Sequence, residues 1–170
     1  MPEISTIIYN KILSNKDNLI YKWENPSQTD TKHIVIDNLL PNDLCEKIHR
    51  SFPKNLDNFY KRSSFREKKK TSTNMRLYDE IINNCLYAFQ DKKVLKIISE
   101  ITKIPNLEAD ENLYAGGISA MSNGDYLNPH IDNSHDITRL KYRRLNLLFY
   151  VTPKWGIKNG GNFELWDKKV

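Results

Sequence analysis

Cysteine and histidine are both rare in this sequence, and each shortage removes a class of site. The chain has two cysteines, Cys45 and Cys85, and neither belongs to a Cys-x-x-Cys pair. A disulfide framework or a structural zinc site needs several closely spaced cysteines, so neither is expected. Reduced thiols are usual inside cells, and we therefore expect a cytoplasmic protein. The histidines number four: His33, His49, His130 and His135.

Long apolar runs are also missing. No stretch approaches the roughly 18 consecutive apolar residues that a membrane span needs. Residues 1–14 are amphipathic, with Glu3 and Lys11 set among isoleucines, and lack the basic, apolar and small-residue layout of a signal peptide. We expect no membrane partner.

Glycine is absent from the first two-thirds of the chain: all six glycines lie at or after residue 116. Before that point the apolar spacing is mostly helical, after a short predicted strand at 33–37. Polar residues at 41–43 mark a helix start. The predicted helical stripes are Leu44, Ile48 and Phe52; Ile81, Ile82, Cys85, Leu86 and Phe89; and Val94, Leu95, Ile97, Ile98 and Ile101, ending before Pro105.

From residue 113 the pattern changes to strands and turns. Strands are predicted at 114–121, 126–132, 143–152 and 162–166. Asn123-Gly124 lies between the first two and suits a tight hairpin turn, because Gly tolerates a positive φ. Helices followed by clustered strands predict an α+β fold with an antiparallel sheet or barrel.

The net charge of +5 comes largely from one stretch, with Lys61, Arg62, Arg66 and three lysines at 68–70 around a single acid, Glu67. Such a run is most often a solvated loop, and that is our expectation. A lid that recruits an acidic substrate and a contact with a polyanion are the alternatives. We do not expect a nucleic-acid partner.

His130 and Asp132 are two residues apart on a predicted strand, so their side chains point to the same face. An imidazole and a carboxylate presented together are two members of the facial triad that binds non-haem Fe(II). A second histidine would complete that triad. His-x-Asp alone is a weak signal, because a surface strand can carry both residues by chance.

The next predicted strand strengthens the case. Arg144, Asn146, Leu148 and Tyr150 share one face, and Leu145, Leu147, Phe149 and Val151 share the other. We expect the apolar face to pack on the N-terminal helices, so the mixed face points into the barrel. Buried polar groups need partners, and a ligand pocket would supply them.

Several segments in order carry a family resemblance: Tyr126–Asp132, Arg144–Thr152, Trp155 and Gly160–Trp166. Together they resemble the prolyl 4-hydroxylase-like branch of the 2-oxoglutarate- and Fe(II)-dependent dioxygenases. The resemblance implies a double-stranded β-helix, or jelly roll, over residues 33–170, with residues 1–32 as a helical extension. It also implies a hydroxylase with Fe(II), with 2-oxoglutarate as cosubstrate and with ascorbate as reductant.

The same resemblance assigns individual roles. His130 and Asp132 would be iron ligands, and Tyr150 would bind the distal carboxylate of 2-oxoglutarate in a pocket lined by Leu148. Tyr126 would lie near the iron. Asn146 and Arg144 would belong to the cosubstrate pocket. The substrate would be a prolyl or other peptide, or a small molecule, because a fold does not choose between them.

The sequence departs from the family at the distal histidine and the basic residue beyond it. Only His135 follows Asp132. We therefore expect a chain that is incomplete at its C-terminus, stops before the distal histidine strand and holds metal weakly on its own. Two alternatives stay open: a non-catalytic jelly-roll binding module with a degenerate metal site, and a cupin-like site completed by His135.

Overall fold

Five α-helices lie in the first 102 residues of the computed structural model, which describes residues 3–114 and 116–166. They are α1 (Ile4–Leu13), α2 (Lys16–Glu24), α3 (Asn42–Ser51), α4 (Glu80–Ala88) and α5 (Lys92–Thr102). A 3-10 turn, η1 (Met75–Leu77), precedes α4. The helical stripes predicted from apolar spacing in α3, α4 and α5 are confirmed.

Short polar side chains set the starts of two of these helices. Asp79 accepts a hydrogen bond from the backbone N–H of Ile81 at 2.9 Å, and Asp91 accepts one from Lys93 at 2.9 Å. Each carboxylate satisfies a backbone donor that has no partner within the helix, a contribution of about 1 kcal/mol. At the other end, α5 stops at Lys103, whose φ of 56° is left-handed.

The hydrophobic core is formed by one face of each helix. Ile8 of α1 and Ile101 of α5 are both 0% exposed, and Leu19 and Ile48 bring in α2 and α3. Burying a side chain of this size stabilises the fold by about 1.5–3 kcal/mol. Among the described residues, all fully buried hydrophobic side chains lie between Ile8 and Leu113.

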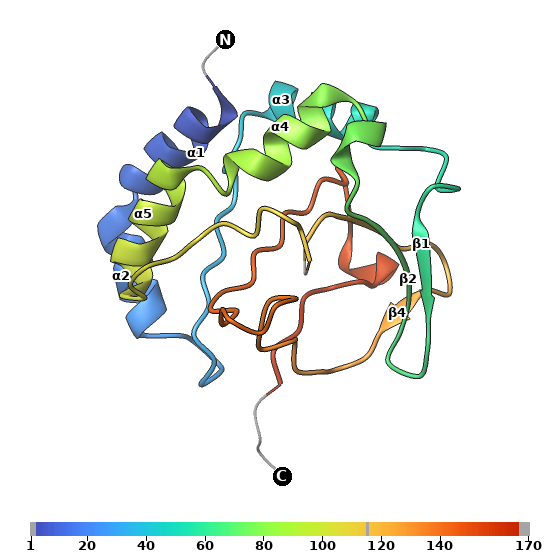
Figure 1. The fold of residues 1–170 in the computed structure, drawn as a ribbon. Coiled ribbons are helices and arrows are strands. Elements are labelled where there is room, and N and C mark those ends of the chain that lie inside the picture. Colours follow the sequence, from blue (N-terminus) through green and yellow to red (C-terminus); the bar gives the residue numbers. More distant parts are fainter. Residues whose placement is uncertain (1–2, 115, 167–170) are drawn as a thin grey trace.

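A small antiparallel sheet lies on the side of the molecule away from α1, α2 and α5 (Figure 1). Its strands in the described part of the chain are β1 (Tyr60–Ser63), β2 (Glu67–Ser72), β3 (Ile118–Ala120) and β4 (Tyr126–Leu127). The prediction of a loop for the basic stretch was therefore wrong. That stretch is the β1–β2 hairpin, closed by the Ser64 N–H donating to the Glu67 carbonyl at 2.8 Å.

The turn at residues 122–125 is present, but it does not join a hairpin. Both β3 and β4 pair with β2, where Lys70 lies opposite Ala120 and Lys68 lies opposite Tyr126. From Lys70 to Lys68 is two residues along β2, but from Ala120 to Tyr126 is six residues along the chain that pairs with it. The turn is therefore a protrusion of four extra residues between β3 and β4, which continue one another along the same edge of β2. Gly124 has a φ of +80°, as the turn prediction required. The predicted pairing of the strands on either side of the turn was wrong, because β3 and β4 both pair with β2 and not with each other.

Most of the other predicted strands are shorter or missing. In the described part of the strand predicted at 114–121, which leaves out residue 115, only β3 forms, and the strand predicted at 126–132 is reduced to β4. Residues 33–37, 143–152 and 162–166 form no strand, because no neighbouring strand pairs with them in the described part of the chain. A second 3-10 turn, η2 (Ile157–Asn159), lies between the last two segments.

The apolar face predicted for residues 145–151 is only partly buried. Phe149 packs on Phe89 with ring centroids 5.2 Å apart, and Val151 also contacts the core. Leu147, by contrast, is 53% exposed. The packing against the helices is therefore confirmed for Phe149 and Val151, but not for Leu147. No helix in the described residues has the length and apolar character to cross a membrane.

Gly117 is the glycine whose replacement should cost most. Its φ is +93°, and an added Cβ would lie 2.3 Å from the backbone oxygen of Ser72. Since Ser72 is held in the β2–β3 ladder, we expect Gly117→Ala to lower the free energy of unfolding by about 3 kcal/mol. Gly124→Ala is the matched control, with a φ of +80° and no atom within 4 Å, and should cost about 1 kcal/mol. Urea unfolding measures both; equal losses would contradict the steric argument.

Cys85 should make stability fall at alkaline pH. It is 4% exposed, and burial raises the pKa of its thiol from 9.0 to about 12. Between these values the unfolded chain has lost the proton and the folded chain has kept it, so rising pH favours unfolding. The expected loss is about 1.4 kcal/mol between pH 8 and 10. In urea unfolding, the free energy of unfolding of Cys85→Ala should fall by about 1.4 kcal/mol less than that of the parent over this pH range. An identical fall in the variant and the parent would exclude Cys85 as its source.

Candidate metal centre

His130 and Asp132 follow β4 in an irregular, extended segment. Pro129 lacks a backbone N–H and so cannot continue the ladder with β2. The residue before it, Asn128, still holds the segment to the β1–β2 turn. Its backbone N–H donates to the Arg66 carbonyl at 2.8 Å, and its side-chain amide donates to the Phe65 carbonyl at 2.7 Å. The segment therefore has a defined position although it is not a strand.

The imidazole of His130 is oriented by its own backbone neighbour. Nδ1 lies 2.7 Å from the carbonyl oxygen of Asn128. A carbonyl oxygen can only accept, so Nδ1 carries the proton in this bond. Nε2 is left to face Oδ1 of Asp132 at 3.3 Å. This is the arrangement in which a backbone carbonyl sets the tautomer of a metal-binding histidine.

The separation of these two atoms suits a shared cation. With metal–ligand bonds of about 2.1 Å, ligands on adjacent vertices of an octahedron lie about 3.0 Å apart. In a neutral ring Nε2 is an acceptor, and the carboxylate oxygen is an acceptor too. A proton or a metal ion between them would satisfy both.

Asp132 has further partners, all of them donors. The side-chain amide of Asn146 donates to Oδ2 at 2.9 Å. Two guanidinium groups lie near the carboxylate, with Arg143 Nη2 3.7 Å from Oδ2 and Arg66 Nη2 3.9 Å from Oδ1. The side chain is 38% exposed, so these charge interactions are screened by water. The carboxylate has one short hydrogen bond, and its other contacts are longer.

Of the predicted site residues, His130, Asp132 and Asn146 are brought together. Leu148 and Tyr150 are exposed, at 53% and 65%. Partial burial nevertheless raises the pKa of the Tyr150 hydroxyl. Tyr126 lies on β4, where its hydroxyl donates to the Ser64 carbonyl at 2.8 Å. Arg144 is exposed, and no contact brings it to Asp132.

Arg66, Asn128 and Arg143 were missed by the sequence analysis. The prediction of a regular strand paired Arg144 with Asn146 by alternation. Because residues 143–146 form no strand, Arg143 instead donates to the Asn146 side-chain oxygen at 2.8 Å. Arg66 could be recognised only as part of a basic run, since its place beside Asp132 depends on how the hairpin folds back.

His135 lies apart from the pair. Its ring packs on Tyr142 with centroids 4.4 Å apart, and Nδ1 lies 2.7 Å from the hydroxyl of Ser134. Within residues 3–114 and 116–166, no three or more His, Cys, Asp or Glu side chains gather into a group that could hold a metal ion. The described geometry therefore gives the cupin-like alternative no third ligand.

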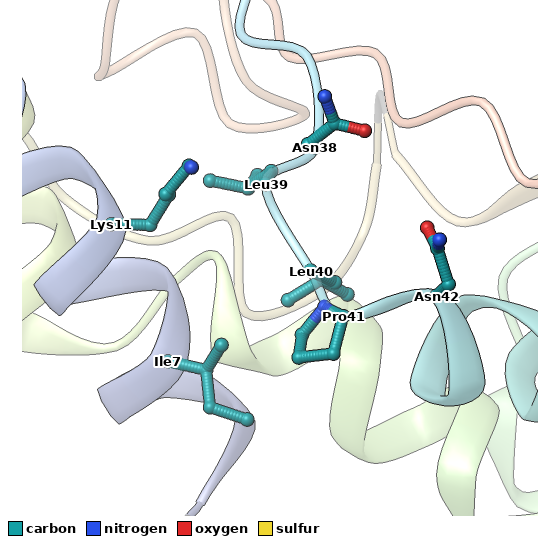
Figure 2. A pocket seen from close by; sticks show the side chains of 7 residues that line it. All are labelled: Ile7, Lys11, Asn38, Leu39, Leu40, Pro41 and Asn42. Atoms are coloured by element: carbon teal, nitrogen blue, oxygen red, sulfur yellow. The ribbon is translucent and has the colours of Figure 1, made fainter.

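A surface hollow of about 410 Å³ lies elsewhere, between α1 and the start of α3 (Figure 2). It is lined by Ile7, Lys11, Asn38, Leu39, Leu40, Pro41 and Asn42. None of these residues belongs to the His130–Asp132 site. The hollow is open, and no histidine, cysteine or carboxylate lines it, so it is not a candidate metal centre.

Comparison with known proteins identifies no relative. No family model matches the sequence, and no curated protein and no solved structure matches the chain. Any assignment of function therefore depends on the residues and contacts described above.

Proposed function

We propose that this chain provides the His130–Asp132 part of the iron site of a 2-oxoglutarate-dependent dioxygenase. The observation that carries the proposal is the pairing of His130 Nε2 with Asp132 Oδ1 at 3.3 Å, with Nδ1 held by the Asn128 carbonyl. Imidazole nitrogen and carboxylate oxygen are the donors that Fe(II) takes in such enzymes. His130 and Asp132 would thus supply two of the three protein ligands of the facial triad.

A jelly-roll core is the fold that this proposal requires. It is supported by the two sides of the segment 143–152: Phe149 and Val151 pack on the helical core, whereas Arg144, Leu148 and Tyr150 lie outside it. Residues 33–170 would form the core and residues 1–32 the helical extension.

In this proposal Fe(II) would supply the oxidation chemistry, in which one oxygen atom of O2 enters a C–H bond of the substrate and the other converts 2-oxoglutarate to succinate and CO2. The protein holds and orients the reactants. Asn146 fixes the Asp132 carboxylate by its 2.9 Å hydrogen bond, which leaves Oδ1 toward His130. Tyr150 would donate its hydroxyl to the distal carboxylate of 2-oxoglutarate, with Leu148 beside it and Tyr126 near the metal.

A second candidate is a non-catalytic binding module, in which Asp132 is a structural anion. The observation in its favour is the set of donors around that carboxylate: Asn146, Arg143 and Arg66. If Asp132 serves only to hold these side chains, its removal should disturb the hairpin contact and no metal should bind.

Metal binding separates the two candidates. Mn(II) is a redox-stable, paramagnetic probe for an N/O site, and we expect it to broaden the ring signals of His130 in NMR spectra of the 170-residue chain. His49 and His33 are internal references in the same spectra. In Asp132→Asn, the same broadening should need a Mn(II) concentration about a hundredfold or more higher, because a charged ligand is lost. Broadening that is equal at all histidines, or unchanged in the variant, would contradict the proposed site.

Tyr150→Phe tests the cosubstrate contact. Loss of one hydrogen bond to a charged group costs about 1.5–3 kcal/mol, so the affinity for 2-oxoglutarate should fall about ten- to a hundredfold. Calorimetric titration of 2-oxoglutarate into the Mn(II)-loaded protein measures the change. Tyr142→Phe, with a ring that is 68% exposed and packed on His135, is the matched control and should bind as the parent does. Equal affinities for Tyr150→Phe and the parent would remove Tyr150 from the pocket.

A further inference from the structure

Within the described residues, one edge of the β1 strand is unpaired. Its other edge pairs with β2, and the far edge of β2 is occupied by β3 and β4. No strand in the described part of the chain pairs with the outer edge of β1, and all four of its residues are exposed. An open edge presents backbone donors and acceptors at the spacing of an extended peptide.

The charges along this hairpin are arranged unfavourably. Lys61 lies directly opposite Lys70, and Arg62 lies directly opposite Lys69. Like charges in directly opposed positions destabilise a strand pair. An acidic partner would relieve this repulsion.

The acids within the hairpin compensate this charge only in part. Glu67 lies 2.9 Å from Lys69 and 3.5 Å from Arg62, so one carboxylate serves two cations. Asp125 is likewise shared, at 3.9 Å from both Lys68 and Lys70. Lys61 has no acidic partner among the described residues.

The hairpin turn lies beside the candidate metal centre. Ser64, Phe65 and Arg66 each accept a hydrogen bond through their carbonyls from Tyr126 or Asn128. Arg66 also reaches Asp132. Phe65 is nevertheless 93% exposed at the tip of this anchored turn. A strand added along β1 would therefore end at an apolar side chain next to the site.

We propose that the free edge of β1 binds an extended acidic peptide, with two adjacent carboxylates opposite Lys61 and Arg62. Neighbouring residues of a strand point to opposite faces, and so do these two cations, which is why the carboxylates are adjacent. A role for this peptide as the substrate would rest on the proposed dioxygenase function. Binding itself needs no metal.

A peptide fits this surface better than a nucleic acid does. The open backbone edge can form a regular ladder of hydrogen bonds only with another extended backbone of the same spacing. A phosphate chain, in contrast, gains its affinity from several uncompensated cations in a row. Here Glu67 and Asp125 lie between the cations and weaken that attraction.

Fluorescence anisotropy with a labelled Thr-Val-Thr-Glu-Glu-Val-Thr-Val peptide tests the proposal, in EDTA so that a failed metal site has no influence. We expect the Glu-Glu peptide to bind about tenfold more tightly than the same peptide with Gln-Gln. The Lys61→Glu, Arg62→Glu double variant should reverse the preference toward a Lys-Lys peptide. Lys22→Glu with Lys47→Glu, on exposed positions of α2 and α3, is the matched control and should leave the preference unchanged.

Hydrogen exchange supplies the second readout. Addition of the Glu-Glu peptide should slow amide exchange in β1, because backbone pairing protects amides that charge attraction alone leaves open. Equal binding of the Glu-Glu and Gln-Gln peptides would overturn the proposal. So would tighter binding of a twelve-residue oligothymidylate than of the Glu-Glu peptide, or binding without protection of β1.

Discussion

Backbone pairing along both edges of β2 is the constraint on which the candidate site depends. One edge of β2 holds β1, and the other holds β3 and β4 in two registers separated by a four-residue protrusion. This double pairing places the β1–β2 turn against Asn128, two residues before His130. Because Pro129 ends the ladder there, the segment that carries His130 and Asp132 is held to the sheet through the hydrogen bonds of Asn128. The close backbone approach of Gly117 to Ser72 belongs to the same constraint.

The electrostatics of the site follow from this arrangement. Arg66 arrives from the hairpin and Arg143 from the later extended segment, and both lie within 4 Å of Asp132. Two guanidinium groups and a neutral amide therefore surround one carboxylate. The hairpin itself keeps an excess of positive charge, since Lys61 and Arg62 face other cations across the strand pair. The proposed metal centre and the proposed acidic peptide therefore meet at one turn, Ser64 to Arg66.

The helical part of the fold was largely predictable, and the later part was not. Ile48, Ile82 and Ile101 lie on apolar stripes of helical period, and each is buried in its helix as expected. Helices satisfy their own backbone, so a local pattern is sufficient to place them. A strand needs a partner from elsewhere in the chain. The pattern at 143–152 could show which side chains alternate, but not whether another strand would pair with them, and none does among the described residues.

For the candidate site, the sequence by itself determined the residue types and their order: a histidine and an aspartate two apart, followed by an asparagine and a tyrosine. The chemistry of those side chains was sufficient to predict an N/O metal site. Only the tertiary structure decided that Asn146 binds Asp132, that Arg143 rather than Arg144 lies near it, and that Arg66 comes from a distant hairpin. The physical reason is that Arg66 is brought to Asp132 by the backbone pairing of β2 with β4, whereas Arg143 and Asn146 are brought there because the chain folds back on itself, with the Arg143 N–H donating to the Ser134 carbonyl at 2.9 Å. Side-chain alternation within one segment carries no information about either neighbour.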